Sequence, residues 1–204
     1  MIKRWALVTR IVLGGMLIVL SVISISGCDD GDAIPTNPIG VGWKSDGIIS
    51  EGEYASSKVI SENYTLWWNS DSTYIYIGMR ATSPAVAGYI GIGFLPQDWT
   101  PAMQKMDADA VIAFVVEGKA YAYDTMMTGP IGPHPVDSSN DVDELSGSVE
   151  GITTTIEFRR KLNTGDKNDQ VLEKGINGIM WAVGFNPTAF GGHSEDGYSE
   201  IVIE

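Results

Sequence analysis

The sequence predicts an all-β fold, an antiparallel immunoglobulin-like β-sandwich. Short runs of β-branched and aromatic residues recur along the chain, and Gly, Asn, Asp and Ser separate them at short intervals. No segment keeps the apolar spacing of a helix over several turns. Many short strands with frequent turns are typical of a sandwich.

The expected strands follow one another along most of the chain. Glu117-Gly118 and Glu150-Gly151 are short turn sequences between β-rich runs, so each predicts a hairpin. The runs expected to form strands are residues 65–68, 74–79, 88–94, 110–116, 119–123, 148–149, 152–158, 179–185 and 200–203.

The run at 88–94 carries small residues on one side. Gly91 and Gly93 alternate with bulky apolar residues, so one face of this strand has no side chains there. Such a face lets another group approach the backbone closely.

The N-terminus has the three parts of an export signal. Lys3, Arg4 and Arg10 precede an apolar run at 11–23, which is shorter than the ~20 residues of a bilayer span. The residues before Cys28 are small, and this segment resembles a lipobox of bacterial lipoproteins. That resemblance implies cleavage after Gly27 and lipid on Cys28, although an uncleaved anchor helix is the alternative.

We therefore expect a signal peptide at 1–27, a flexible tether at 28–40 and one domain at 41–204. The tether is rich in Pro, Gly and Asp. Cleavage removes three of the 13 basic residues and none of the 26 acidic ones, which leaves a net charge of −16. Such a charge disfavours nucleic acid as a partner. The expected location is the extracytoplasmic side of a cell membrane, held by lipid.

Few residues offer chemistry. The histidines are His134 and His193, both expected in loops, and Cys28 is the one cysteine. There is no Gly-x-Ser-x-Gly motif and no phosphate-binding loop, so we do not expect an enzyme. By spacing alone, a solvated loop explains either histidine.

Methionines and acids supply the other candidates. Met103 and Met106 precede the run at 110–116 among charged residues, whereas packing explains Met126 and Met127. The acidic run at 137–144 lacks the Asp-x-Asp-x-Asp-Gly spacing of a calcium loop, so we interpret it as a solvated loop.

From residue 46 to residue 203 the chain resembles a DOMON domain, the β-sandwich of dopamine β-monooxygenase relatives and of extracellular cytochrome domains. Each matching segment is short, and the pattern is specific because the segments occur together in order. They are residues 46–54, the glycine-rich run at 89–94, the segment Met106-Asp107-Ala108-Asp109 with the strand after it, residues 158–166, and residues 181–184 with His193 downstream.

This resemblance implies a non-covalent haem b between the two sheets. It assigns Met106 and His193 as axial ligands, with Met103 as the alternative sulfur, and Gly91, Gly93 and Trp181 as the haem slot. Methionine opposite histidine raises the potential of the iron and suits electron transfer. An extracytoplasmic redox protein is then the expected partner.

The sequence is compatible with two other functions. A carbohydrate-binding module is one, because other members of the family bind sugars and Trp43, Trp67, Trp68 and Trp99 offer stacking surfaces. A ligand-free interaction domain is the other. Haem-free glycan binding would favour the first, and binding of neither ligand would favour the second.

Overall fold

The computed structural model describes residues 42–132, 134–188 and 192–204. The expected signal peptide, Cys28 and the tether lie outside the described residues, so their predictions stay predictions. Within these described ranges no helix has the length and apolarity needed to span a membrane.

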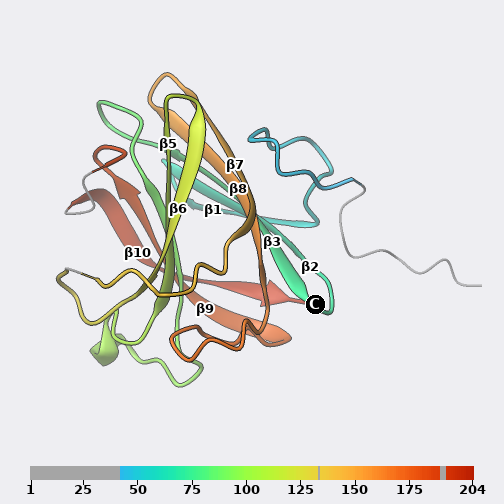
Figure 1. The fold of residues 1–204 in the computed structure, drawn as a ribbon, viewed down its shortest axis with the longest axis vertical. Coiled ribbons are helices and arrows are strands. Elements are labelled where there is room, and N and C mark those ends of the chain that lie inside the picture. Colours follow the sequence, from blue (N-terminus) through green and yellow to red (C-terminus); the bar gives the residue numbers. More distant parts are fainter. Residues whose placement is uncertain (1–41, 133, 189–191) are drawn as a thin grey trace, which may run out of the picture. The chain divides into compact units, whose positions relative to one another are not determined.

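The domain consists of two antiparallel five-stranded sheets (Figure 1). The first sheet has the order β1-β2-β3-β8-β7, and the second has the order β10-β9-β4-β5-β6. The strands are β1 (Ser56–Ser61), β2 (Tyr64–Ser70), β3 (Tyr74–Thr82), β4 (Ile90–Phe94), β5 (Asp109–Val116), β6 (Lys119–Met126), β7 (Asp143–Glu150), β8 (Thr153–Lys161), β9 (Gly175–Gly184) and β10 (His193–Ile203). The predicted antiparallel sandwich is confirmed.

The backbone conformation of the turn between β5 and β6 explains why these strands form the predicted hairpin. Glu117 has φ 53° and Gly118 has φ 75°, so both residues are left-handed, as a two-residue type I′ turn requires. This turn fixes the register in which Val116 faces Lys119 and Ile112 faces Tyr123.

The strands differ most from the prediction in three places. Strand β1 was not expected, β7 is longer than the two residues predicted, and β10 begins at His193. His193 is therefore the first residue of a strand and not part of a loop before it. It pairs with Gly184 of β9, which fixes its position at the edge of the second sheet.

The core lies between the two sheets. Leu66, Ile77 and Phe158 contribute from the first sheet, and Ile92 and Val111 contribute from the second, all with at most 1% of their surface exposed. Each belongs to a strand whose alternate residues point the other way. The centre of the interior is thus packed with apolar side chains and leaves no room there for a large ligand.

The segment before β1 is fastened to the first sheet by the buried Glu157. Its carboxylate accepts hydrogen bonds from the backbone N–H groups of Asp46, Gly47 and Ile48 and from the hydroxyl of Tyr54. Charge-assisted bonds of this kind hold a loop firmly. They explain the structural role of the 46–54 motif seen in the sequence.

Candidate functional site

The face of the second sheet that points away from the first, here called the outer face, has a floor of small residues. The register places Asp196, Ala182, Gly91, Ile112 and Tyr123 side by side across five strands. An ideal Cβ on Gly91 would lie 3.6 Å from the Cβ of Ala182, with no closer neighbour. The centre of the outer face is therefore hollow because two adjacent positions carry almost no side chain.

The next row across the sheet is filled by a methionine. Met180, Gly93 and Ala110 lie side by side there. A Cβ on Gly93 would lie 2.6 Å from Cε of Met180, so this glycine makes room for the thioether. Met180 and Met127 are buried together in a small apolar cluster at this end of the outer face.

A cavity of about 880 Å³ lies over this floor. Its walls are Tyr89 and His193 on one side and residues of the loop after β6, including Ile131 and His134, on the other. The volume falls within the ~300–1,000 Å³ usual for ligand pockets, and most of its lining is apolar. The outer face therefore carries a site large enough for a sizeable apolar cofactor.

The position of this cavity corrects one expectation. The resemblance implied haem between the sheets, but Gly91 and Gly93 face outward while Ile90, Ile92 and Phe94 of the same strand fill the interior. The alternation of β4 thus puts the open space on the outer face.

His193 lies at the edge of the cavity with an acid beside it. Its Nδ1 lies 3.2 Å from Oδ1 of Asp196, and its side chain is 33% exposed. Asp196 also lies 3.7 Å from Nζ of Lys105, through its other oxygen. A carboxylate at Nδ1 favours the tautomer in which Nε2 carries the free lone pair, the usual arrangement behind a metal-binding histidine.

His134 also lines the cavity, which the sequence did not indicate. Its Nδ1 is buried and has no hydrogen-bond partner among the described residues. Burial and the nearby charge of Lys105 both lower the pKa of His134. At neutral pH its imidazole is therefore uncharged and can act as a donor to a metal.

The two predicted sulfur ligands lie in the turn before β5. Met103 ends the short 3₁₀ helix Pro101–Met103 and is half-buried, whereas Met106 is 41% exposed. Neither is among the described residues that line the cavity, although Lys105 between them is. Gln104 and Asp107 have φ values of 52° and 59°, so this turn holds two non-glycine residues in a strained conformation.

Trp181, in β9, is one of the residues that line the cavity. Its neighbours along the strand point alternately to the two faces of the sheet. Its ring lies 5.3 Å from the ring of Tyr64, centroid to centroid, and packs against the core between the sheets. Its indole therefore belongs to the interior, and the slot above Gly91 and Gly93 owes its shape to Ala182 and Met180 instead.

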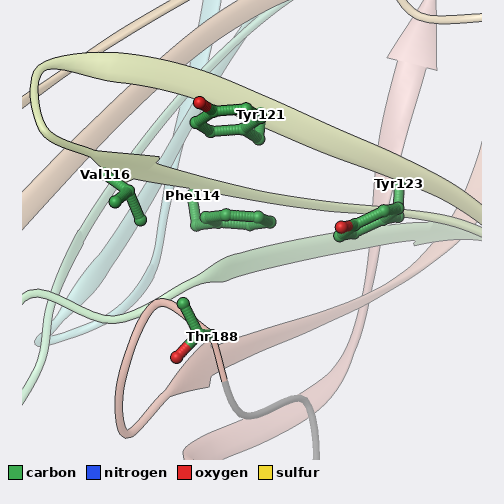
Figure 2. A pocket seen from close by; sticks show the side chains of 5 residues that line it. All are labelled: Phe114, Val116, Tyr121, Tyr123 and Thr188. Carbon is green, nitrogen blue, oxygen red and sulfur yellow. The ribbon is translucent and has the colours of Figure 1, made fainter.

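A second, shallower hollow of about 280 Å³ adjoins the cavity (Figure 2). Phe114, Tyr121 and Tyr123 line it with roughly parallel rings, and Thr188 lies across from them. Tyr121 and Tyr123 are each 39% exposed, and Tyr123 lines both hollows. The outer face thus offers an aromatic surface beside the main cavity.

The tryptophans considered as sugar platforms do not form such a surface. Trp68 is 8% exposed and belongs to the core, and Nε1 of Trp43 donates a hydrogen bond to Tyr54. The guanidinium of Arg80 lies over the ring of Trp67 at 5.4 Å. Trp99 lies on the other sheet, against Tyr198 and the small cluster of Met127 and Met180.

The donors around the cavity fit a haem group. Gly91 and Ala182 leave room for a flat ring, His193 supplies a nitrogen at the edge, and Met127 and Met180 supply thioethers within the lining. An apolar slot with histidine and methionine donors is the environment of a b-type cytochrome with two axial ligands. The sequence suggested a solvated loop for His134 and packing for Met127, and it gave no indication of Met180, because only strand register and loop folding bring these three residues to the cavity.

Comparison with known proteins agrees with this fold. The family model of the DOMON domain matches residues 60–184. Human DBH-like monooxygenase protein 1 is 32% identical over 120 residues, 58% of this chain and 18% of that protein. The MOXD1 homolog 2 of Drosophila melanogaster is 28% identical over 113 residues, 55% of this chain and 14% of that protein.

A solved structure has a similar fold. The cytochrome domain of Myriococcum thermophilum cellobiose dehydrogenase superposes with a TM-score of 0.54 at 13% identity, covering 73% of this chain and 81% of that one. The matches to the two curated relatives span less than a fifth of their lengths.

Proposed function

The chain belongs to the DOMON domain family, and from this premise we propose that it is a membrane-anchored, extracytoplasmic b-type haem-binding domain for electron transfer. The observation that carries the proposal is His193, which lines an apolar cavity of about 880 Å³ with Asp196 behind its Nδ1. The haem, when bound, supplies a one-electron iron centre.

The chain's own residues have separate tasks in this proposal. His193 binds through Nε2, Asp196 orients its ring, and the floor at Gly91 and Ala182 keeps side chains away from the porphyrin plane. The apolar loop residue Ile131, which is 85% exposed, becomes covered when the cavity is filled. With His193 and a second residue both holding the iron, no position would be left for oxygen, so the haem would supply electron transfer and not oxygen activation.

We propose Met106 as the second ligand, with Met103 as the alternative. Met106 follows Lys105, which lines the cavity, and its side chain is flexible and exposed. The backbone N–H of Asp107 donates a hydrogen bond to the carbonyl of the cavity residue Met127, which keeps this segment beside the cavity. Met127, Met180 and His134 are rivals that already line the cavity, and the test must separate them from Met106.

The test is haem titration of the purified domain with absorption spectroscopy. We expect one haem per chain and the six-coordinate low-spin spectrum of a histidine–methionine pair. His193→Ala should lose that spectrum while the haem-free variant keeps its melting temperature, because the ring is a third exposed. Failure of the wild-type protein to take up haem would refute the proposal.

A set of single variants identifies the second ligand. Met106→Ala should convert the spectrum to five-coordinate high-spin, while variants with alanine at Met103, Met127, Met180 or His134 should not. Lys119→Ala, on the far end of the β5–β6 hairpin, serves as the control. A low-spin spectrum that survives in Met106→Ala but not in one of the others assigns that residue instead.

The anchor and the location complete the proposal. Lipid on Cys28 and a tether at 28–40 would keep the domain near the extracytoplasmic face of a membrane, and the net charge of −16 favours a basic redox partner. Metabolic labelling with a radioactive fatty acid tests this, since Cys28→Ser should abolish the label and release the protein from membranes.

The second candidate is carbohydrate binding, and the aromatic hollow at Phe114, Tyr121 and Tyr123 favours it. The rings of Tyr121 and Tyr123 are each 39% exposed and stack on the buried Phe114, and such exposed rings suit the apolar face of a sugar. Calorimetry of the haem-free protein with oligosaccharides checks this alternative, and Tyr121→Ala should weaken any such binding. The monooxygenase activity named for the relatives is not carried over, because the matches cover so little of them.

A further inference from the structure

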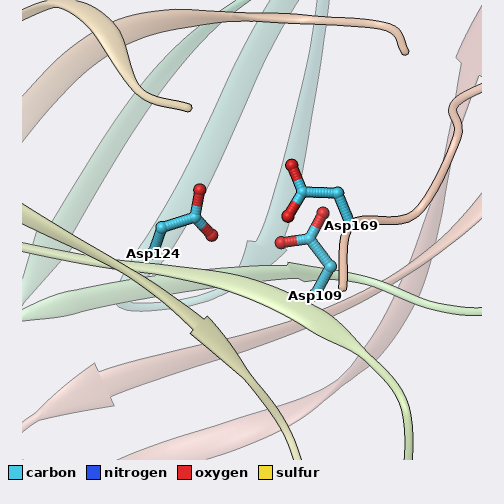
Figure 3. Close-up of side chains that lie close together, drawn as sticks. All are labelled: Asp109, Asp124 and Asp169. Carbon is cyan, nitrogen blue, oxygen red and sulfur yellow. The ribbon is translucent and has the colours of Figure 1, made fainter. Parts of the chain in front are cut away.

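Three aspartate side chains, Asp109, Asp124 and Asp169, lie close together (Figure 3). Asp109 begins β5 and Asp124 lies in β6, while Asp169 comes from the loop between β8 and β9. One carboxylate oxygen of each lies within 4.8 Å of those of the other two. Asp109 and Asp124 alternate with outward-facing Ala110 and Thr125, so this cluster is on the opposite face of the sheet from the cavity proposed to bind haem.

The cluster contains fewer positively charged groups than carboxylates. Arg160, 1% exposed, is ion-paired with Asp109 and Asp169. Nothing basic contacts Asp124 among the described residues; its Oδ2 accepts a hydrogen bond from the backbone N–H of Asp141. One guanidinium therefore faces three carboxylates, and the side chains of Arg160, Asp109 and Asp169 are at most 3% exposed.

Two oxygens in this cluster have no partner in the described structure. Oδ1 of Asp109 and Oδ1 of Asp124 are buried without a hydrogen bond, and each residue is 1% exposed. Oδ2 of Asp141, in the loop beside them, is also buried without a partner. Buried polar atoms almost always have a partner, and an ionised oxygen left alone is costly. A cation or a proton bound to these oxygens would remove this energetic cost.

Burial and mutual repulsion act on the same groups. They raise the pKa of Asp124 to about 7, and burial followed by the charge of Asp109 raises the pKa of Asp169 to about 6. The carboxylates are thus hard to keep ionised together unless another positive charge joins them.

The donor set distinguishes between metals. The carboxylate oxygens of the cluster lie within 4.8 Å of one another, close enough to share one calcium ion, whose ligand oxygens lie at most about 4.6–5.2 Å apart. Calcium accepts an irregular set of carboxylate oxygens, whereas magnesium demands near-ideal octahedral geometry and keeps several waters. Carboxylates alone, without thiolate or imidazole, also suit a hard cation and not zinc.

We propose that Asp109, Asp124 and Asp169 bind one calcium ion inside the sandwich, with Asp141 as a further oxygen donor. The acidic run at 137–144, expected to be a solvated loop, contributes Asp141 to this site. A second acidic group, Asp137, Asp166 and Asp169, does not qualify, because Oδ1 of Asp137 and Oδ1 of Asp166 already accept hydrogen bonds from Asn168.

The experiment compares melting temperatures of the domain in EDTA, in calcium and in magnesium, with calorimetry of calcium binding. For wild type we expect one saturable site and a rise of about 5–10 °C in Tm at calcium about 100 times Kd. Magnesium should give a clearly smaller rise. An equal rise with both ions, or no calcium binding at millimolar concentration, would overturn the proposal.

The most informative variant is Asp124→Asn, because it keeps the shape of the side chain and removes one negative charge. In EDTA it should melt above wild type, since repulsion in the cluster falls, and calcium should no longer raise its Tm. Asp98→Asn removes the same charge from an exposed loop and should respond to calcium as wild type does. If Asp98→Asn loses the response equally, the effect is charge screening and the site is refuted.

A second variant keeps the test conclusive if Asp124→Asn does not fold. Asp141→Asn changes a loop residue outside the strands and should weaken calcium binding without unfolding the domain. Full wild-type affinity in both Asp124→Asn and Asp141→Asn would exclude this cluster as the site. The readout does not involve haem, so it stands whether or not the proposed function holds.

Discussion

The two faces of β4 carry opposite kinds of residue. Its inward residues Ile90, Ile92 and Phe94 are at most 1% exposed and pack against the first sheet. Its outward residues Gly91 and Gly93 carry no side chain and underlie the cavity. One strand thus builds a core and a binding floor by alternation, and the two can be changed separately.

The largest expected effect comes from the inward face. Ile92→Ala should lower the free energy of unfolding by about 2–5 kcal/mol, because it removes buried apolar volume that the surroundings cannot refill. Urea unfolding measures this, with an unchanged m-value. Val59→Ala, at a residue 73% exposed, should change it by less than about 0.5 kcal/mol. Similar losses in both variants would mean that β4 does not anchor the core.

The same contrast shows how much of the fold the sequence could predict. Apolar alternation identified the strands that face the core, such as the run at 74–79 within β3. Strand β1 contains Ser56, Ser57 and Lys58, and β7 begins in the acidic run. These are edge strands whose pairing partners make them strands, so their own residues give little indication.

The candidate site was predictable to a similar degree. Gly91, Gly93 and His193 were recognised because their residue types and family pattern are distinctive. Met180 faces the cavity only because β9 pairs with β4 in a register that sets it opposite Gly93. Register is decided by the whole sheet, so no local pattern could reveal this contact.

Tyr64 connects the two faces and gives an intermediate effect. Its ring is in the core, and its hydroxyl donates a hydrogen bond of 3.2 Å to the backbone carbonyl of Gly91. Tyr64→Phe should cost about 0.5–1.5 kcal/mol at neutral pH, measured by urea unfolding. A larger loss would mean that the hydroxyl holds the floor in place.

Alkaline pH gives this variant a second readout. Burial raises the pKa of Tyr64 above its ordinary value of 10, so the folded state keeps a proton that the unfolded state releases. The stability is therefore fully present below about pH 10 and falls as pH rises above it, by about 1.4 kcal/mol per pH unit for one proton. Tyr64→Phe should flatten the alkaline slope by that amount, and an unchanged slope would contradict the burial of this hydroxyl.

The smallest effect on stability, and the clearest on ligand binding, belongs to the outward face. The nearest neighbour of a Cβ at Gly91 is the Cβ of Ala182 at 3.6 Å, so Gly91→Ala and Gly91→Leu should fold with changes below about 1 kcal/mol. A leucine there projects into the space proposed for the porphyrin. Overpacking of about 1–3 kcal/mol corresponds to haem binding about 5- to 150-fold weaker, with Gly91→Ala close to wild type. Because the interior face is untouched, haem titration of the leucine variant with wild-type affinity would show that the ligand does not lie on the glycine floor.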